Sequence, residues 1–280
     1  MEMVKAKVAA AVALVLLCAG ALRAQERSFS WTQTRMDGTR TGVTSPNADN
    51  VREALGEIRG RKYVAPNGRV FRRGATPAVA KVMIDAQEVM SSVKEVVGYA
   101  TRDMSARRPE SELSNWFIDE LMRATAELTG KKVDVGITNF GGIRTDFYAG
   151  PVIKDDVLSM FPFKNSLCYI ALKGADLRYW FEQMAANGVQ AVGGVKLVIQ
   201  DRKLQEVTVG GEPLDDGKVY GLATISFLLD GGDGLSLARN AVELIDTETM
   251  IIDVMLPYVR RLTAEGKPVE YHTDGRVVIL

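Results

Sequence analysis

The central segment of this chain reads VDVGITNFGGIR, from Val133 to Arg144. Its first six residues, 133–138, are rich in β-branched side chains and are typical of a buried strand. The glycines that follow allow a backbone to approach a ligand closely, and Asn139 and Arg144 place an amide and a planar cation on either side of them. The segment lacks the Gly-Lys-Ser/Thr of a Walker loop and the spacing of a dinucleotide fingerprint. Taken alone, it is compatible with a ligand-binding loop and with a tight strand-to-loop turn.

Helical and strand patterns alternate irregularly on both sides of this segment. A helix is expected from Thr76-Pro77, which supply a cap and a first-turn proline. A second helix is expected after Ser111, with a buried stripe that runs to Leu128 and an end at Gly130. The remaining patterns predict helices at 155–160, 174–186 and 247–264, and strands at 133–138, 166–172, 194–200, 205–209, 219–224 and 276–280. The expected fold class is therefore α/β (α+β), a mixed β-sheet flanked by helices.

The first 24 residues have the features of a signal peptide. Lysines at positions 5 and 7 precede an apolar run at 8–17, and small residues then lead to a cleavage site near Ala24. The run is shorter than the roughly 20 residues of a membrane span, so no transmembrane segment is expected. The chain is accordingly expected to be exported, to a periplasm or to the extracellular space. A lipoprotein anchored through Cys18 is the weaker alternative, because Leu17 precedes it where a small residue is usual.

Residues 25–76 are predicted to form an irregular N-terminal arm. They are rich in Arg, Thr, Gly and Asn, carry several turn signals, and contain at most one short helix, at 48–55. The domain proper is expected to cover residues 77–280.

The composition excludes several kinds of chemistry. The 280 residues include one histidine and two cysteines, and the formal net charge is zero. A hydrolytic zinc site usually needs several His or Cys ligands, and a Ser-His or Cys-His mechanism needs a well-placed imidazole. The balanced charge gives no general attraction for nucleic acid. His272 is expected in a solvated loop, and Cys168, within an apolar run, is expected to be a small buried side chain.

A second glycine-rich stretch, Phe227 to Gly234, reads FLLDGGDG. Its acidic residues suggest calcium, but the spacing of an EF-hand counted from Asp230 would need oxygen ligands at Gly232 and Gly234. The stretch is better explained as a turn that presents one carboxylate.

Five separate motifs, in order and at matching intervals, resemble the C-terminal domain of the 5′-nucleotidases over about residues 75–265. They are Asn-x-Gly-Gly-Ile-Arg at 139–144, Gly-Pro-Val-Ile at 150–153 leading into Asp-Val at 156–157, Phe-Pro-Phe at 161–163, Leu-Lys-Gly-Ala-Asp-Leu at 172–177, and Phe227 with Gly-Gly-Asp-Gly at 231–234. The sequence departs from the family at Phe140, where a third glycine is usual.

The resemblance implies a nucleotide-binding site. Phe163 and Phe227 would stack on the two faces of the base, and Asp233, an acceptor-only carboxylate, would bind both ribose hydroxyls. Asn139 would contact the base and Arg144 the phosphate. A further phosphate-binding arginine lies upstream in the family and is assigned to Arg107, with Arg108 as a close competitor. The implied substrate-binding residues are Arg107, Asn139, Gly141, Gly142, Arg144, Phe163, Phe227, Gly232 and Asp233.

In this family a separate calcineurin-like domain holds two metals and performs hydrolysis. This sequence has no Asp-x-His and no Asn-His-Glu, so no catalytic or metal-binding residue is assigned to it. The resemblance therefore predicts a nucleotide-recognition chain that binds a nucleotide such as AMP, while Zn²⁺- or Mn²⁺-type metals lie on a separate calcineurin-like metallophosphatase partner. With the signal-peptide pattern, this chain is expected to be exported. The alternative is a non-catalytic nucleoside- or nucleotide-binding protein.

Overall fold

The structure, a computed structural model, describes residue 46 and residues 48–280. The chain divides into two units, Met1–Gly42 and Val43–Leu280, and every element named below belongs to the second. The predicted signal peptide and the first half of the predicted arm lie outside the described residues.

The described part of the predicted arm contains regular structure. A short helix α2 (Val51–Leu55) falls where one was expected, but residues 57–71, expected to be irregular, form an antiparallel sheet of three short strands. These are β1 (Glu57–Arg59), β2 (Lys62–Val64) and β3 (Val70–Phe71). Strands of two or three residues are too short to show a period-two pattern. Only the turns between them could therefore be predicted from the sequence. The helix predicted from Thr76 follows as α3 (Thr76–Val89), but Thr76 is not its cap: Ala75 is the N-cap residue, and no side chain caps the helix.

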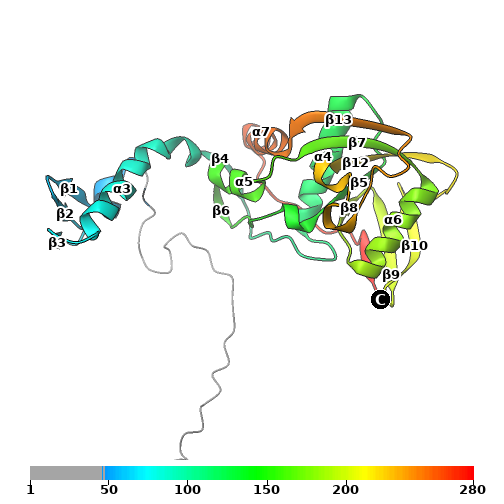
Figure 1. Cartoon of the computed structure of the whole chain (residues 1–280), viewed down its shortest axis with the longest axis horizontal. Coiled ribbons are helices and arrows are strands. Elements are labelled where there is room, and N and C mark those ends of the chain that lie inside the picture. The colour runs from blue at the N-terminus through cyan, green and yellow to red at the C-terminus, as the bar shows by residue number, and fades with distance from the viewer. Residues whose placement is uncertain (1–45, 47) are drawn as a thin grey trace, which may run out of the picture. The chain divides into compact units, whose positions relative to one another are not determined.

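A five-stranded mixed sheet forms the centre of the domain, in the order β13-β7-β12-β5-β8 (Figure 1). The strands β12 and β5 are parallel neighbours, and every other adjacent pair is antiparallel. The α/β fold class with a mixed sheet is thus confirmed. The strands are β5 (Val135–Thr138), β7 (Ser166–Lys173), β8 (Ala191–Gly193), β12 (Val219–Ile225) and β13 (Glu243–Met250).

Helix α4 (Glu112–Thr129) packs against this sheet. Two paired glycines, Gly136 of β5 and Gly193 of β8, allow the close approach. A Cβ atom on Gly136 would lie 2.6 Å from Met122 and 2.8 Å from Ile118, and one on Gly193 would lie 2.6 Å from Met122. Side chains at these two positions would therefore push the helix away from the sheet.

The ends of α4 are those predicted from the sequence. The Ser111 side chain accepts a hydrogen bond from the backbone N–H of Ser114, and the Ser114 side chain accepts one in return. This reciprocal cap satisfies two backbone donors that would otherwise lack partners. Gly130, in the left-handed conformation at φ 66°, ends the helix.

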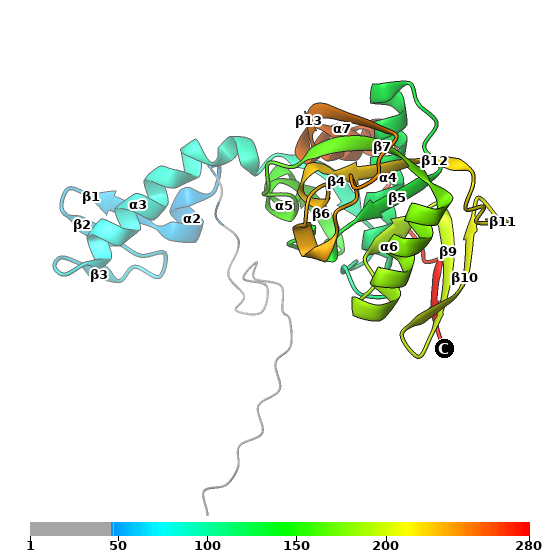
Figure 2. The ribbon, with the colours of Figure 1, turned by 45° about the vertical axis from the view of Figure 1, so that its right-hand side comes forward.

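A second sheet has the order β11-β10-β9-β14, and a third pairs β4 with β6. Helix α6 lies against β10 (Figure 2), and α7 packs on α4 and β4. None of the described helices is long and apolar enough to cross a membrane. The elements are β4 (Val96–Ala100), β6 (Gly150–Ile153), α5 (Lys154–Met160), α6 (Gly174–Asn187), β9 (Val195–Gln200), β10 (Lys203–Val209), β11 (Glu212–Pro213), α7 (Ile251–Ala264) and β14 (Val277–Ile279).

Two local expectations were wrong. The helix expected from 247 begins at Ile251, because residues up to Met250 continue β13 and pair with β7. Leu128 belongs to the apolar pattern of α4 but is exposed, as is its neighbour Glu127 in the last turn of the helix.

Cys168 is fully buried in β7, as predicted. Burial, with a smaller contribution from Asp246, raises the pKa of its thiol to about 12. We expect iodoacetamide at pH 8 to label Cys168 at least about a hundredfold more slowly in the folded protein than in urea, because the thiolate is the nucleophile. The Cys18→Ser chain makes Cys168 the sole thiol for this measurement by mass spectrometry. Equal rates in the two states would contradict the burial.

Candidate functional site

Two glycine-containing loops meet at one edge of the five-stranded sheet. The first leaves β5 at Asn139, and the second leaves β12 at Ser226. Because β5 and β12 are parallel and hydrogen-bonded to each other, their carboxyl ends lie side by side. Loops that are more than 80 residues apart in sequence are thereby brought together.

The first loop is a short 3₁₀ turn, Phe140–Gly142. A Cβ atom at Gly142 would lie 2.9 Å from Oδ1 of Asn139, which explains the glycine at this position. The Asn139 side chain is only 5% exposed, and its Oδ1 has no hydrogen-bond donor among the described residues.

The second loop contains two 3₁₀ turns, Ser226–Leu228 and Gly232–Gly234. A Cβ atom at Gly232 would lie 2.0 Å from the carbonyl oxygen of Phe227, so this position requires glycine. Asp233 adopts the left-handed conformation at φ 49°, which Asp tolerates better than most residues. These constraints hold Phe227 and Asp233 at fixed places on the loop.

A hydrogen bond joins the two loops: Nδ2 of Asn139 donates to Oδ2 of Asp233 over 2.9 Å. A Cβ atom on Gly141 would lie 3.4 Å from the same amide nitrogen and 3.8 Å from Asp233. The amide of Asn139 thereby orients the carboxylate of Asp233. Asp233 therefore does more than stabilise its own turn.

Two aromatic side chains are exposed at this site, Phe163 at 46% and Phe227 at 45%. Phe163 lies in the loop between α5 and β7, and the Arg144 guanidinium lies 5.8 Å from the centre of its ring. Nη1 of Arg144 also donates to the carbonyl oxygen of Gly141 over 3.2 Å. An exposed phenylalanine beside a cation, such as Phe163 beside Arg144, is an arrangement that can bind a planar aromatic ligand with an anionic group.

A pocket of about 500 Å³ adjoins Asp233. Of the two candidate upstream arginines, Arg108 lines this pocket and Arg107 does not. The structure thus places the competing residue, Arg108, in the same pocket as Asp233 of the second loop. The lining residues are Arg108, Gln183, Met184, Asn187, Gly188, Gln190, Asp233, Gly234 and Leu235.

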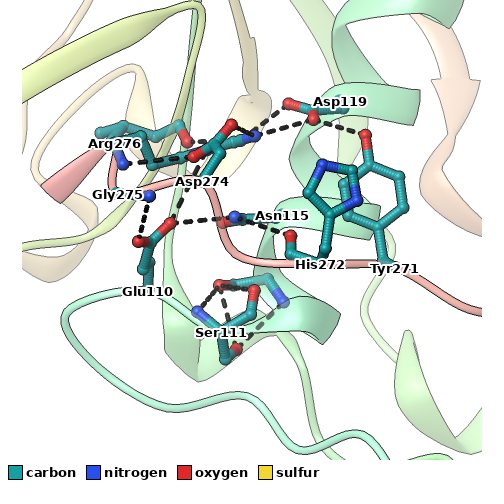
Figure 3. Close-up of polar contacts among 11 residues, drawn as sticks. Glu110, Ser111, Asn115, Asp119, Tyr271, His272, Asp274, Gly275 and Arg276 are labelled. Atoms are coloured by element: carbon teal, nitrogen blue, oxygen red, sulfur yellow. Dashed lines mark hydrogen bonds and ion pairs between the residues drawn. The ribbon is translucent and has the colours of Figure 1, made fainter.

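The loop that carries both arginines is fixed by a polar network at its end (Figure 3). Oε1 of Glu110 accepts a hydrogen bond from the N–H of Gly275 over 2.8 Å, and its Oε2 accepts one from Asn115 over 3.0 Å. Asn115 also bonds the carbonyl oxygen of His272, whose exposed ring stacks on Tyr271. The C-terminal segment, far away in sequence, therefore holds the arginine loop against α4.

Sequence reasoning missed Gln190 and this network. Gln190 accepts hydrogen bonds from the Phe140 backbone and from Arg108, but it follows α6 in a loop without any motif, 50 residues after the glycine turn. The network depends on contacts between residues up to 165 positions apart. No local pattern in the sequence could have indicated either feature.

The sequence profile described as "5′-nucleotidase, C-terminal domain" matches residues 92–239 of this chain. Protein UshA of Yersinia enterocolitica is 30% identical over 163 residues, which cover 56% of this chain and 29% of UshA. Cell wall protein Lmo0130 of Listeria monocytogenes is 29% identical over 238 residues, which cover 74% of this chain and 30% of that protein. The chain thus matches less than a third of the length of either relative.

The crystal structure of a 5′-nucleotidase precursor from Thermus thermophilus superimposes with a TM-score of 0.64 and 24% identity, covering 78% of this chain and 45% of that one. This likeness establishes the fold. The profile match extends over more than half of the 280 residues and includes both loops of the site. The chain therefore belongs to the 5′-nucleotidase C-terminal domain family.

Proposed function

We propose that this chain is the nucleotide-recognition part of a 5′-nucleotidase-type phosphohydrolase, and that hydrolysis is performed by metals on a separate calcineurin-like metallophosphatase chain. The observation that carries the proposal is the bond from Asn139 to Asp233, which joins the glycine motif to the loop of Phe227. This bond supports the proposal because it holds the loop of Phe227 and Asp233 against the loop that leads to Arg144.

The nucleoside would be bound by the aromatic side chains and the carboxylate. Phe163 and Phe227 expose ring faces on which a base can stack, a contact worth about 1–3 kcal/mol per base in other nucleic-acid systems. Asp233, oriented by Asn139, would accept hydrogen bonds from the two ribose hydroxyls. Gly141, next to Asp233, leaves room for the sugar.

The phosphate would be bound by Arg144 together with an arginine of the 107–108 pair. Arg144 has no carboxylate within ion-pair distance among the described residues, so the donors that do not bind the carbonyl oxygen of Gly141 are available to an anion. The nearby carboxylate of Asp146 accepts a hydrogen bond from Ser105. The described residues contain no group of three His, Cys, Asp or Glu side chains that could hold a metal. In this proposal the part of this chain is to position the nucleotide.

Export belongs to the same proposal. The N-terminal 24 residues have the pattern of a signal peptide, and one relative of this chain is named a cell wall protein. A mature N-terminus at Gln25, found by mass spectrometry, would support secretion, whereas a lipid on Cys18 would support the anchored alternative.

Calorimetric titration tests the nucleotide site. We expect Arg144→Gln to weaken AMP binding about tenfold or more while leaving adenosine affinity unchanged, because only AMP carries the phosphate. Arg178→Gln is the matched control, since Arg178 pairs with Asp216 and lies outside the site. An absence of binding of both AMP and adenosine to the unaltered chain would refute the proposal.

The division of labour is tested by activity. We expect the purified chain with Mn²⁺ or Zn²⁺ to leave AMP intact, and a calcineurin-like phosphatase that co-purifies with it to hydrolyse AMP faster when the two are mixed. AMP binding without any stimulation of such a partner would favour the non-catalytic binding protein. Enzyme-like hydrolysis by the chain alone, lost in Arg144→Ala, would show that no partner is needed.

A further inference from the structure

Phe140 occupies the motif position where a third glycine is usual in the family. Its side chain is 7% exposed, so it lies within the protein and does not fill the open site. Its backbone N–H donates to Oε1 of Gln190 over 3.1 Å, and the guanidinium of Arg108 lies 4.9 Å from the centre of its ring. Phe140 thus supports an arginine from another loop.

Arg108 is held by two further contacts. Its Nε donates to the carbonyl oxygen of Val189 over 2.8 Å, and its Nη2 donates to Oε1 of Gln190 over 3.2 Å. Gln190 is 6% exposed, and its oxygen accepts from both Phe140 and Arg108. The plane and the position of the guanidinium are therefore defined by a ring face, a carbonyl and an amide.

The rest of the Arg108 guanidinium is available to a ligand. Among the described residues no carboxylate lies within ion-pair distance of Arg108, and its side chain is exposed along the pocket shared with Asp233. Nη1 in particular has no protein acceptor in that part of the chain. An oriented guanidinium with unused N–H donors is well suited to a phosphate, which it can contact through two parallel hydrogen bonds.

Arg107 is placed differently. Its backbone N–H donates to Oγ of Ser111 over 3.2 Å, at the cap of α4, and its exposed side chain has no partner among the described residues. A flexible exposed arginine loses more side-chain entropy when it binds an anion than one that is already oriented. The geometry therefore distinguishes two neighbouring arginines that the sequence left as competitors.

We propose that Phe140 and Gln190 are positioning residues that hold Arg108, rather than Arg107, as the second phosphate-binding arginine. The proposal rests on the nucleotide site proposed above. If the ribose is bound at Asp233, the 5′-phosphate is separated from the sugar ring by one methylene group and one ester oxygen, and Arg108 lines the same pocket as Asp233. The phenylalanine in the glycine motif then has a function: it supplies the ring face that orients this cation.

The test is calorimetric titration of the full chain with AMP and with adenosine. We expect Arg108→Gln to weaken AMP binding about tenfold or more, and Arg107→Gln less than about threefold, with adenosine affinity unchanged in both. Phe140→Leu, which keeps an apolar side chain but removes the ring face, should weaken AMP binding about three- to tenfold without affecting adenosine. Phe140→Tyr retains the ring face, so this variant should bind AMP nearly as tightly as the unaltered chain. Arg178→Gln again serves as the matched control.

Several results would overturn this inference. One is a larger loss of AMP affinity in Arg107→Gln than in Arg108→Gln. Another is an equal loss of AMP and adenosine affinity in Phe140→Leu. A third is an AMP affinity of Phe140→Tyr as low as that of Phe140→Leu. In each of these cases AMP binding that depends on Arg144 would persist, so the proposed function would stand while the positioning role fell. If neither AMP nor adenosine bound the unaltered chain, both proposals would fall together.

Discussion

Arg276→Met is expected to lower the free energy of unfolding by about 3 kcal/mol, the loss typical of breaking a buried ion pair. Arg276 is 8% exposed and lies at the centre of the network in Figure 3. Its Nη1 and Nη2 donate to the Asp119 carboxylate over 2.8 and 3.0 Å, and its Nε and Nη2 donate to Asp274 over 2.9 and 2.7 Å. Methionine fills similar space but leaves both carboxylates without their cation.

The pKa shifts in this network have a clear direction. Burial alone would lower the pKa of Arg276, but its hydrogen bonds to Asp274 and Asp119 outweigh burial and raise it. The hydrogen bond from Arg276 lowers the pKa of Asp274. A carboxyl whose folded pKa is depressed stabilises the protein above its unfolded pKa, about 4, and loses that effect as the pH falls through the folded pKa. The penalty of Arg276→Met should therefore shrink below about pH 4.

Urea unfolding at pH 7 and pH 3 measures the loss of stability and its decrease at low pH. The comparison requires that the slope of the unfolding free energy against urea concentration is the same in both proteins. Arg260→Met is the matched control, because Arg260 forms an exposed pair with Glu95 over 2.7 Å. Exposed pairs contribute only about 0–1 kcal/mol, and we expect the control to change stability by less than about 1 kcal/mol. Equal effects of the two substitutions would show that the buried network contributes no more than an exposed pair.

Gly232→Ala is expected to weaken adenosine and AMP binding by roughly ten- to a hundredfold, which corresponds to the loss of one stacked base. The added Cβ atom would lie 2.0 Å from the carbonyl oxygen of Phe227 and 2.9 Å from Cδ1 of its ring. The nearest clash is with backbone, so a side-chain rotation cannot relieve it. The turn must shift, and with it the ring of Phe227 and the carboxylate of Asp233.

Titration with adenosine measures this loss, and NMR shifts of the Phe227 ring protons report the displacement without any ligand. Gly217→Ala is the control, because a Cβ atom there has its nearest neighbour at 3.4 Å, on the Asp215 side chain. If the chemical shifts of the Phe227 ring protons change while adenosine binds normally, Phe227 does not contribute to the proposed site. If those chemical shifts are unchanged, the turn accommodates alanine at position 232 without moving Phe227.

Much of the secondary structure could be predicted because its signals are local. The two ends of α4 were predicted correctly from Ser111 and Gly130, because a cap and a left-handed glycine act within one helical turn. The small sheet at 57–71 and the strand β13 could not be predicted. Their pairing depends on neighbouring strands, and short or polar strands show little periodicity of their own.

For the candidate site, the sequence could supply only a set of residues. The motifs named Asn139, Arg144, Phe163, Phe227 and Asp233, and the resemblance supplied a role for each. No spacing in the sequence indicates that Asn139 bonds Asp233, because that contact follows from the parallel pairing of β5 and β12. The choice between the two upstream arginines likewise required the positions of residues remote in sequence.

The sequence by itself indicated the family and the mixed α/β class. These properties depend on composition and on patterns within single segments. The tertiary structure decided which groups act together: the bond between the two loops, the ring of Phe140 beneath Arg108, and the network around Arg276. The physical reason is that hydrogen bonds, ring contacts and buried ion pairs act over a few ångströms in space, and the fold alone brings distant residues within that range.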